Sequence, residues 1–160
     1  MNIFSTEEIA YHEAGHVVAC FILGLPFRYA TIRSNKRIAA AGHIYASIWD
    51  LPHEIEGTDP EQLVCFAVMS CSGYEAQKII NPTANVDGSR EDYSRARALL
   101  LACLEDESFV GISRQLDEIK ISAGSLIRDN ETRVHNAAKA LLKHETLGYH
   151  ALHVALKDAV

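Results

Sequence analysis

The sequence predicts a single, mainly α-helical domain over residues 1–160, a helical array that carries a short two-stranded β-ribbon. Helix start and stop signals recur along the chain, and apolar residues follow a helical spacing between them. Only two short stretches are rich in the β-branched and aromatic residues that favour strands. Hydrophobic residues make up 48% of the chain and charged residues 22%, which indicates a globular domain that can bury a core.

The first predicted helix begins with a capping box and ends at a glycine. Ser5 can accept a hydrogen bond from the first turn, and Glu8 three positions later can return one. Gly24 and Pro26 supply the stop. Because apolar residues surround the helix after His16, we expect it to be buried in the core.

The ribbon is predicted at residues 27–33 and 41–48, with a turn at 34–36 between them. An edge strand can align an extended peptide by backbone pairing, so residues 41–48 are a candidate platform for such a peptide. The other predicted helices cover residues 61–80 after an Asp59–Gln62 capping box, about 89–107, one or two helices over 113–146, and 149–157.

His12, Glu13 and His16 form the pattern H-E-x-x-H inside the first helix. Residues four apart lie on one face of a helix, about 6 Å between their β-carbons, so both imidazoles can reach one metal ion. Glu13 falls on the flank, where it can reach a water beside the metal without being a ligand. The motif therefore predicts a metal-dependent peptidase with Glu13 as its general base.

A catalytic zinc site requires a third protein ligand and one open position. The third histidine of the extended pattern H-E-x-x-H-x-x-G-x-x-H is missing, because Ala19 and Ile22 occupy its last two fixed positions. The third ligand must come from further along the chain. Spacing alone leaves six residues open: His43, His53, Glu75, Asp87, Glu91 and Asp92.

Residues 9–16, IAYHEAGH, resemble the peptidase-domain signature of the FtsH family of ATP-dependent zinc metalloproteases. Three later segments extend the likeness, in the family's order, over nearly the whole chain. They are residues 26–33, PFRYATIR, which resemble the strand after the motif helix; residues 88–92, GSRED, followed by Ala96, which resemble G-A-S-N-D-x-x-x-A; and residues 140–147, ALLKHETL, which resemble A-L-L-x-x-E-T-L.

The resemblance implies an FtsH peptidase-like fold and one Zn²⁺ ion held by His12, His16 and Asp92, with Glu13 as general base. An alternative stays open for Asp92. Ser89 and Asp92 also form a capping-box pattern, so the Asp92 carboxylate can serve the helix start alone. Glu75, on the preceding predicted helix, is then the next candidate for the third ligand.

The predicted function is a zinc-dependent endopeptidase that hydrolyses unfolded or delivered polypeptides. The chain has no G-x-x-x-x-G-K-[ST] phosphate loop, so we expect no ATP hydrolysis, and a partner ATPase would have to deliver folded substrates. Gln77 and Lys78 stand where family members usually carry acidic residues, and residues 105–113 look shortened. The alternative is a catalytically silent peptidase-like adaptor or regulatory module of a larger protease or ATPase. Assembly into a homo-oligomer stays open.

Composition argues against two classes of partner. The net charge is −6 and no basic run is present, which disfavours nucleic acid and anionic lipid.

The most apolar run, residues 14–25, is shorter than the roughly 20 residues of a membrane span, and the N-terminus has no basic n-region. We therefore expect a cytoplasmic protein. Its four cysteines form no C-x-x-C pair and are expected to be free thiols among apolar residues: Cys20, Cys65, Cys71 and Cys103.

Overall fold

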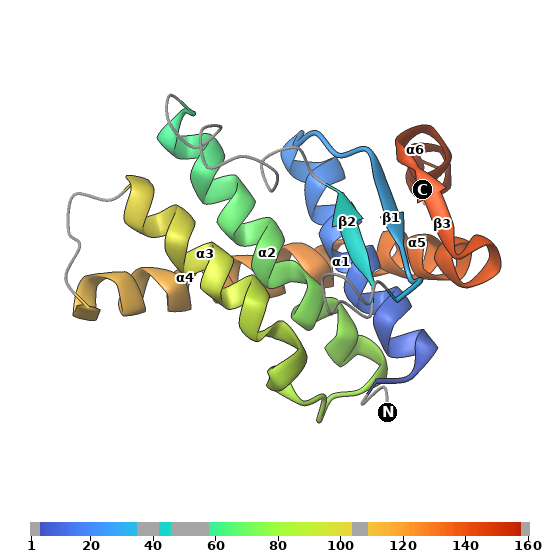
Figure 1. Cartoon of the computed structure of the whole chain (residues 1–160), viewed down its shortest axis with the longest axis horizontal. Coiled ribbons are helices and arrows are strands. Elements are labelled where there is room, and N and C mark those ends of the chain that lie inside the picture. The colour runs from blue at the N-terminus through green and yellow to red at the C-terminus, as the bar shows by residue number, and fades with distance from the viewer. Residues whose placement is uncertain (1–3, 35–41, 46–57, 104–108, 158–160) are drawn as a thin grey trace.

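The computed structural model describes residues 4–34, 42–45, 58–103 and 109–157, which form six α-helices and one small sheet (Figure 1). Helices dominate, as the sequence predicts. The helices are α1 (Thr6–Leu23), α2 (Pro60–Ile80), α3 (Arg90–Cys103), α4 (Phe109–Asp129), α5 (Glu131–His144) and α6 (Tyr149–Lys157), with a 3₁₀ turn η3 (Val86–Ser89) before α3. The strands are β1 (Tyr29–Thr31), β2 (His43–Tyr45) and β3 (Thr146–Gly148).

The sheet has three antiparallel strands in the order β2-β1-β3, so the prediction of a two-stranded ribbon is wrong in strand number. Helix α5 ends at Glu145, whose φ is 60°, and the chain then enters β3. Because residues 113–146 follow a helical spacing, the sequence pattern does not indicate a strand there. β3 then pairs with β1 through the register Thr31↔Thr146 and Tyr29↔Gly148. The paired part of the first predicted strand is also shorter, residues 29–31 instead of 27–33.

Helix α1 lies at the centre of the molecule and contacts α2, α5 and the sheet (Figure 1). Its predicted capping box is present: Ser5 Oγ accepts from Glu8 N, and a Glu8 carboxylate oxygen accepts from Ser5 N. Gly24, at φ 68°, ends it in the left-handed conformation. Its residues are buried on nearly every side, which confirms the predicted core helix.

Gly15 lets α1 and α2 approach closely. A β-carbon at this position would lie 2.4 Å from the Ser72 carbonyl oxygen, a distance that no side chain can accept. Glycine inside a helix costs about 1 kcal/mol relative to alanine, so a close contact must justify it. The neighbouring element is thus the backbone of α2, and the two helices that build the site are pressed together at this point.

The predicted stretch 113–146 forms two helices that meet at Asn130. Of the apolar residues expected to face the core there, Ile119, Ile127, Val134 and Leu141 are buried, whereas Leu142 is exposed. The third predicted helix is α3 as far as Cys103, and its predicted end at 107 lies outside the described residues. None of the described helices has the length and apolarity that a bilayer crossing requires. All four cysteines are free, with Cys20 and Cys71 buried and Cys65 and Cys103 partly buried.

Candidate metal centre

Helix α1 brings His12 and His16 to one place, as their spacing predicts. The two Nε2 atoms lie 3.1 Å apart, and the rings meet edge to face with centroids 4.8 Å apart. Only 6% of the His16 side chain is exposed, against 14% for His12. The pair therefore opens toward solvent on the His12 side.

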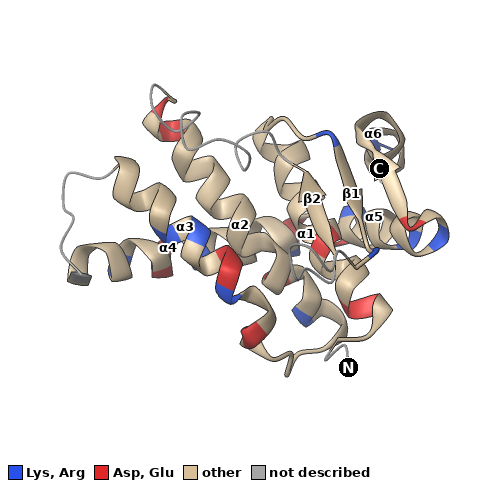
Figure 2. Ribbon diagram, viewed as in Figure 1, with Lys and Arg blue, Asp and Glu red and all other residues tan. Residues whose placement is uncertain are grey.

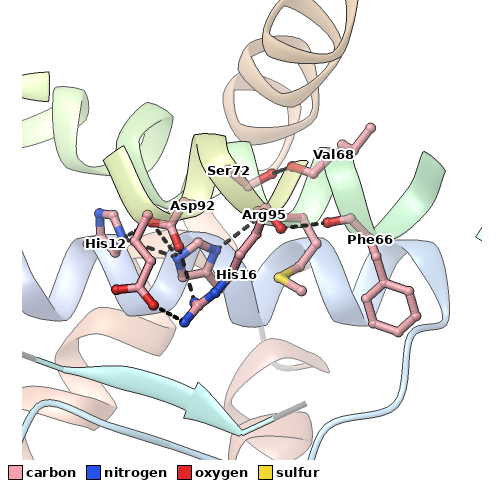
Figure 3. Close-up of polar contacts among 10 residues, drawn as sticks. His12, His16, Phe66, Val68, Ser72, Asp92 and Arg95 are labelled. Atoms are coloured by element: carbon pink, nitrogen blue, oxygen red, sulfur yellow. Dashed lines mark hydrogen bonds and ion pairs between the residues drawn. The ribbon is translucent and has the colours of Figure 1, made fainter. Parts of the chain in front are cut away.

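Asp92, in the first turn of α3, joins the two histidines (Figure 3). Its Oδ2 lies 3.0 Å from His12 Nε2 and 3.7 Å from His16 Nε2. Helix α3 contacts α2, which in turn packs on α1, so a carboxylate distant in sequence meets the motif. Among the described residues, these three form the one group of histidine, cysteine and acidic side chains placed to hold a metal ion.

The other candidates for a third ligand have different partners. Glu75 pairs with Lys78 at 2.5 Å and lies beside Gly124 of α4. Asp87 pairs with Arg90, Glu91 pairs with Arg95, and His43 Nε2 contacts the Tyr29 hydroxyl at 3.2 Å. His53 lies outside the described residues.

The hydrogen bonding of the site leaves an excess of acceptors. The Met69 carbonyl lies 2.8 Å from His16 Nδ1 and can only accept, so this nitrogen must carry a proton. In the neutral imidazole, His16 Nε2 then carries a lone pair. His12 Nε2 lies between that lone pair and the Asp92 carboxylate, and one proton can serve only one of them. His12 Nε2, His16 Nε2 and Asp92 Oδ2 thus converge with more lone pairs than protons, and a cation between them would balance that excess.

The distances and the free space both suit a cation. Bonds of about 2.0–2.1 Å in tetrahedral geometry place ligand atoms roughly 3.3–3.4 Å apart, and the observed separations of 3.0, 3.1 and 3.7 Å bracket that value. Gly73 of α2 keeps the space clear. A β-carbon there would lie 2.6 Å from His16 Nε2 and 2.7 Å from His12 Nε2. The residues present therefore fit a metal ion.

Glu13 is a buried carboxyl group beside this centre. It is 4% exposed, and its Oε2 is buried with no hydrogen-bond partner in the part of the chain that the structure describes. Burial raises the pKa of Glu13 to about 8, against the opposing charge of His12. Gly42, next to β2, allows this placement because a β-carbon there would lie 2.9 Å from Glu13 Oε1. The base predicted from the motif is therefore buried beside the site.

Asp92 has the opposite electrostatics. Burial by itself raises its pKa, but the charges and hydrogen bonds of His16 and His12 outweigh that effect and hold the pKa below its ordinary value. The carboxylate is thus kept in the ionised form that a metal ligand requires.

Several residues of the site escape the sequence reasoning. Met69 orients His16, Gly73 provides the space, and Arg95 contacts Asp92 at 3.7 Å. Gly73 does leave a signal, because a lone glycine inside a helical pattern often marks a close approach. Met69 acts through its backbone, which no side-chain pattern reveals.

No family model matches the chain, and no curated protein matches it.

Proposed function

We propose that this protein is a zinc-dependent endopeptidase that holds one zinc ion with His12, His16 and Asp92. The observation that carries the proposal is the convergence of three acceptor atoms on a space kept clear by Gly73. Two imidazole nitrogens and one carboxylate leave a fourth position open, which is the donor set of a catalytic zinc site. The resemblance of residues 9–16 to the FtsH peptidase signature supports the same assignment.

The bound zinc ion would polarise the peptide carbonyl and lower the pKa of the attacking water. Glu13 would accept a proton from the attacking water and return it to the leaving nitrogen. Glu13 is buried beside the two histidines, which keeps its carboxyl group near the place where the proton would be transferred. His16 is kept in the required tautomer by its bond to the Met69 carbonyl.

An extended polypeptide is the substrate that this surface suits. In the described sheet β2 is an edge strand, and neighbouring Gly42 lies against Glu13. Edge strands bind extended peptides through backbone hydrogen bonds, so a peptide paired with β2 would lie near the base. We propose that unfolded segments, or chains delivered by a partner ATPase, are cleaved there.

The alternative of a silent adaptor is less consistent with Glu13. A buried carboxyl group with an unsatisfied oxygen destabilises the fold by about 1–3 kcal/mol. An adaptor that uses the metal only as a structural support has no need of such a group. A peptidase requires it.

The test is purification of the chain without metal, followed by addition of one equivalent of zinc. We expect one ion per chain and cleavage of casein or quenched peptides that stops with a chelator and returns with zinc. His16→Ala should abolish both binding and cleavage. Zinc binding without cleavage of any unfolded substrate would favour the adaptor, and failure to bind zinc would exclude both functions.

A further inference from the structure

We propose that Arg95 is a positioning residue of the metal centre, which holds the Asp92 carboxylate so that its Oδ2 faces the two histidines. This inference rests on the metal site proposed above. It extends that site from α1 and the start of α3 to the second turn of α3, where the sequence pattern indicated no role.

The two oxygens of Asp92 have different partners (Figure 3). Oδ2 lies 3.0 Å from His12 Nε2, whereas Oδ1 lies 3.7 Å from Arg95 Nη1. A partial rotation of the carboxylate would move Oδ1 away from the guanidinium and Oδ2 away from the histidines at the same time. Carboxylates that bind metals commonly have their second oxygen held in this way by an outer group.

Arg95 is itself held in place by Glu91, one turn earlier on α3. Its Nη2 contacts Glu91 Oε1, while Nη1 faces Asp92. Figure 2 shows the acidic and basic positions gathered at this end of α3. The planar guanidinium can face two carboxylates at once, which the single ammonium of lysine cannot do with the same geometry. Glu91 and Asp92 are adjacent in sequence, so Arg95 spans both from one helical turn away.

Burial distinguishes this arrangement from an ordinary surface ion pair. The side chain of Asp92 is only 13% exposed, whereas Glu91 is 68% and Arg95 42% exposed. Exposed pairs on a helix contribute little, because water screens them. Arg95 therefore connects a solvent-exposed acid to a shielded one that belongs to the site.

The direction of the change in zinc affinity tests the inference, because charge repulsion and positioning predict opposite changes when Arg95 is replaced. A guanidinium repels a divalent cation, so its charge alone predicts that zinc binds more tightly once Arg95 is neutralised. A positioning role predicts the reverse, because Asp92 loses its fixed orientation. Loss of such outer contacts weakens metal binding about 10–100-fold.

The experiment compares Arg95→Gln, Arg95→Lys and Arg90→Gln by competition for zinc between the protein and a chelator. Arg90 is the matched control, since it lies on α3 like Arg95 but pairs with Asp87 of η3 and is 79% exposed. We expect weaker zinc binding by about 10–100-fold in Arg95→Gln, partial recovery in Arg95→Lys and no change in Arg90→Gln. The cobalt-substituted Arg95→Gln protein should also lose visible absorption intensity, which reports a change in metal geometry.

Asp92→Asn separates the two proposals. If it and Arg95→Gln both weaken binding while the metal-free variants melt with the unaltered protein, the positioning role is supported. Unchanged or tighter zinc binding in Arg95→Gln, with Asp92→Asn still impaired, would overturn the role of Arg95 and leave the zinc site standing. An unaltered chain that binds no zinc would overturn the proposed function and the inference together.

Discussion

Two glutamates on α1, five residues apart, have opposite environments. Glu8 sits at the helix start and contacts the end of α2, whereas Glu13 sits beside the histidines and against Gly42. The Glu8 carboxylate accepts hydrogen bonds from Ser5 N at 2.9 Å and Asn81 Nδ2 at 2.8 Å. These bonds, that of the Ser5 backbone first, lower the pKa of Glu8 to about 2, whereas burial raises that of Glu13 to about 8.

The difference separates a carboxylate whose hydrogen bonds stabilise the fold from one whose hydrogen bonding is incomplete. Glu8 closes the capping box and connects α1 to the end of α2, so its contacts are already complete. Glu13 is buried with one oxygen unsatisfied, which costs free energy in the metal-free protein. Residue type and helix are the same, so burial and the surrounding hydrogen-bond donors separate the two glutamates.

The largest expected effect is on catalysis. Glu13→Gln should lower the turnover of a quenched peptide about 10²–10⁴-fold, because the side chain no longer accepts a proton. Its zinc content should stay at one ion. Glu8→Gln is the matched change and should leave turnover within about twofold, since it lies outside the site. Equal losses in the two variants would contradict the distinction drawn here.

The next effect concerns the space beside the histidines. Gly73→Ala should weaken zinc binding by at least about 100-fold, because its methyl group would lie within 2.7 Å of both Nε2 atoms. Ser72→Ala, one position earlier on α2, is the control and should bind zinc normally. Chelator competition measures the affinity, and circular dichroism checks that the helix content of the protein is unchanged. Normal zinc binding by Gly73→Ala would place the metal elsewhere.

In the metal-free protein, substitution of Glu13 should increase the free energy of unfolding instead of lowering it. Since its folded pKa is raised above 4.5, the unfolded chain releases a proton that the folded chain keeps, and stability falls as pH rises from about 4.5 to about 8. Glu13→Gln should remove this loss and raise the unfolding free energy at pH 8 by about 1–3 kcal/mol. Urea denaturation at pH 5 and pH 8 measures it. A destabilised Glu13→Gln at pH 8 would mean that the carboxylate has a partner.

The smallest expected effect belongs to Glu8. Glu8→Ala should destabilise the protein at pH 7 by about 1 kcal/mol or less, because the group is partly exposed and its contacts are screened. With a lowered folded pKa, the contribution of Glu8 is present above pH 4.5 and is lost as pH falls toward 2. The denaturation midpoints of variant and unaltered protein should therefore converge in acid. A gap that persists at pH 2 would point to packing instead of charge.

Local features of the fold and the site were predictable because they depend on neighbouring residues. Ser5 and Glu8 form their capping box, Gly24 ends α1, and His12 and His16 converge because one helical turn separates them. Each of these relations joins residues within about one helical turn, so it can be inferred from the local sequence. The same reasoning explains why α6 was predicted at its observed bounds.

Features that depend on distant contacts could not be predicted in this way. Spacing left six residues open for the third ligand, and only the packing of α3 on α2 places Asp92 beside His12. β3 is three residues long and follows a helix directly, so its sequence is too short to show a strand pattern. Its pairing with β1 is what identifies it as a strand. Met69 contributes a carbonyl oxygen, which every residue carries.

The close crossing at Gly15 has a consequence for how a cation would be captured. Helix α1 is seated against the Ser72 carbonyl of α2, and His16 contacts the Met69 carbonyl of the same helix, so both motif histidines lie at a tightly packed helix crossing. The two candidate ligands on α1 are thus preorganised by helix packing, and the one on α3 by its contact with Arg95. Little conformational entropy would then be lost when an ion binds, which favours a tight site even in a small domain.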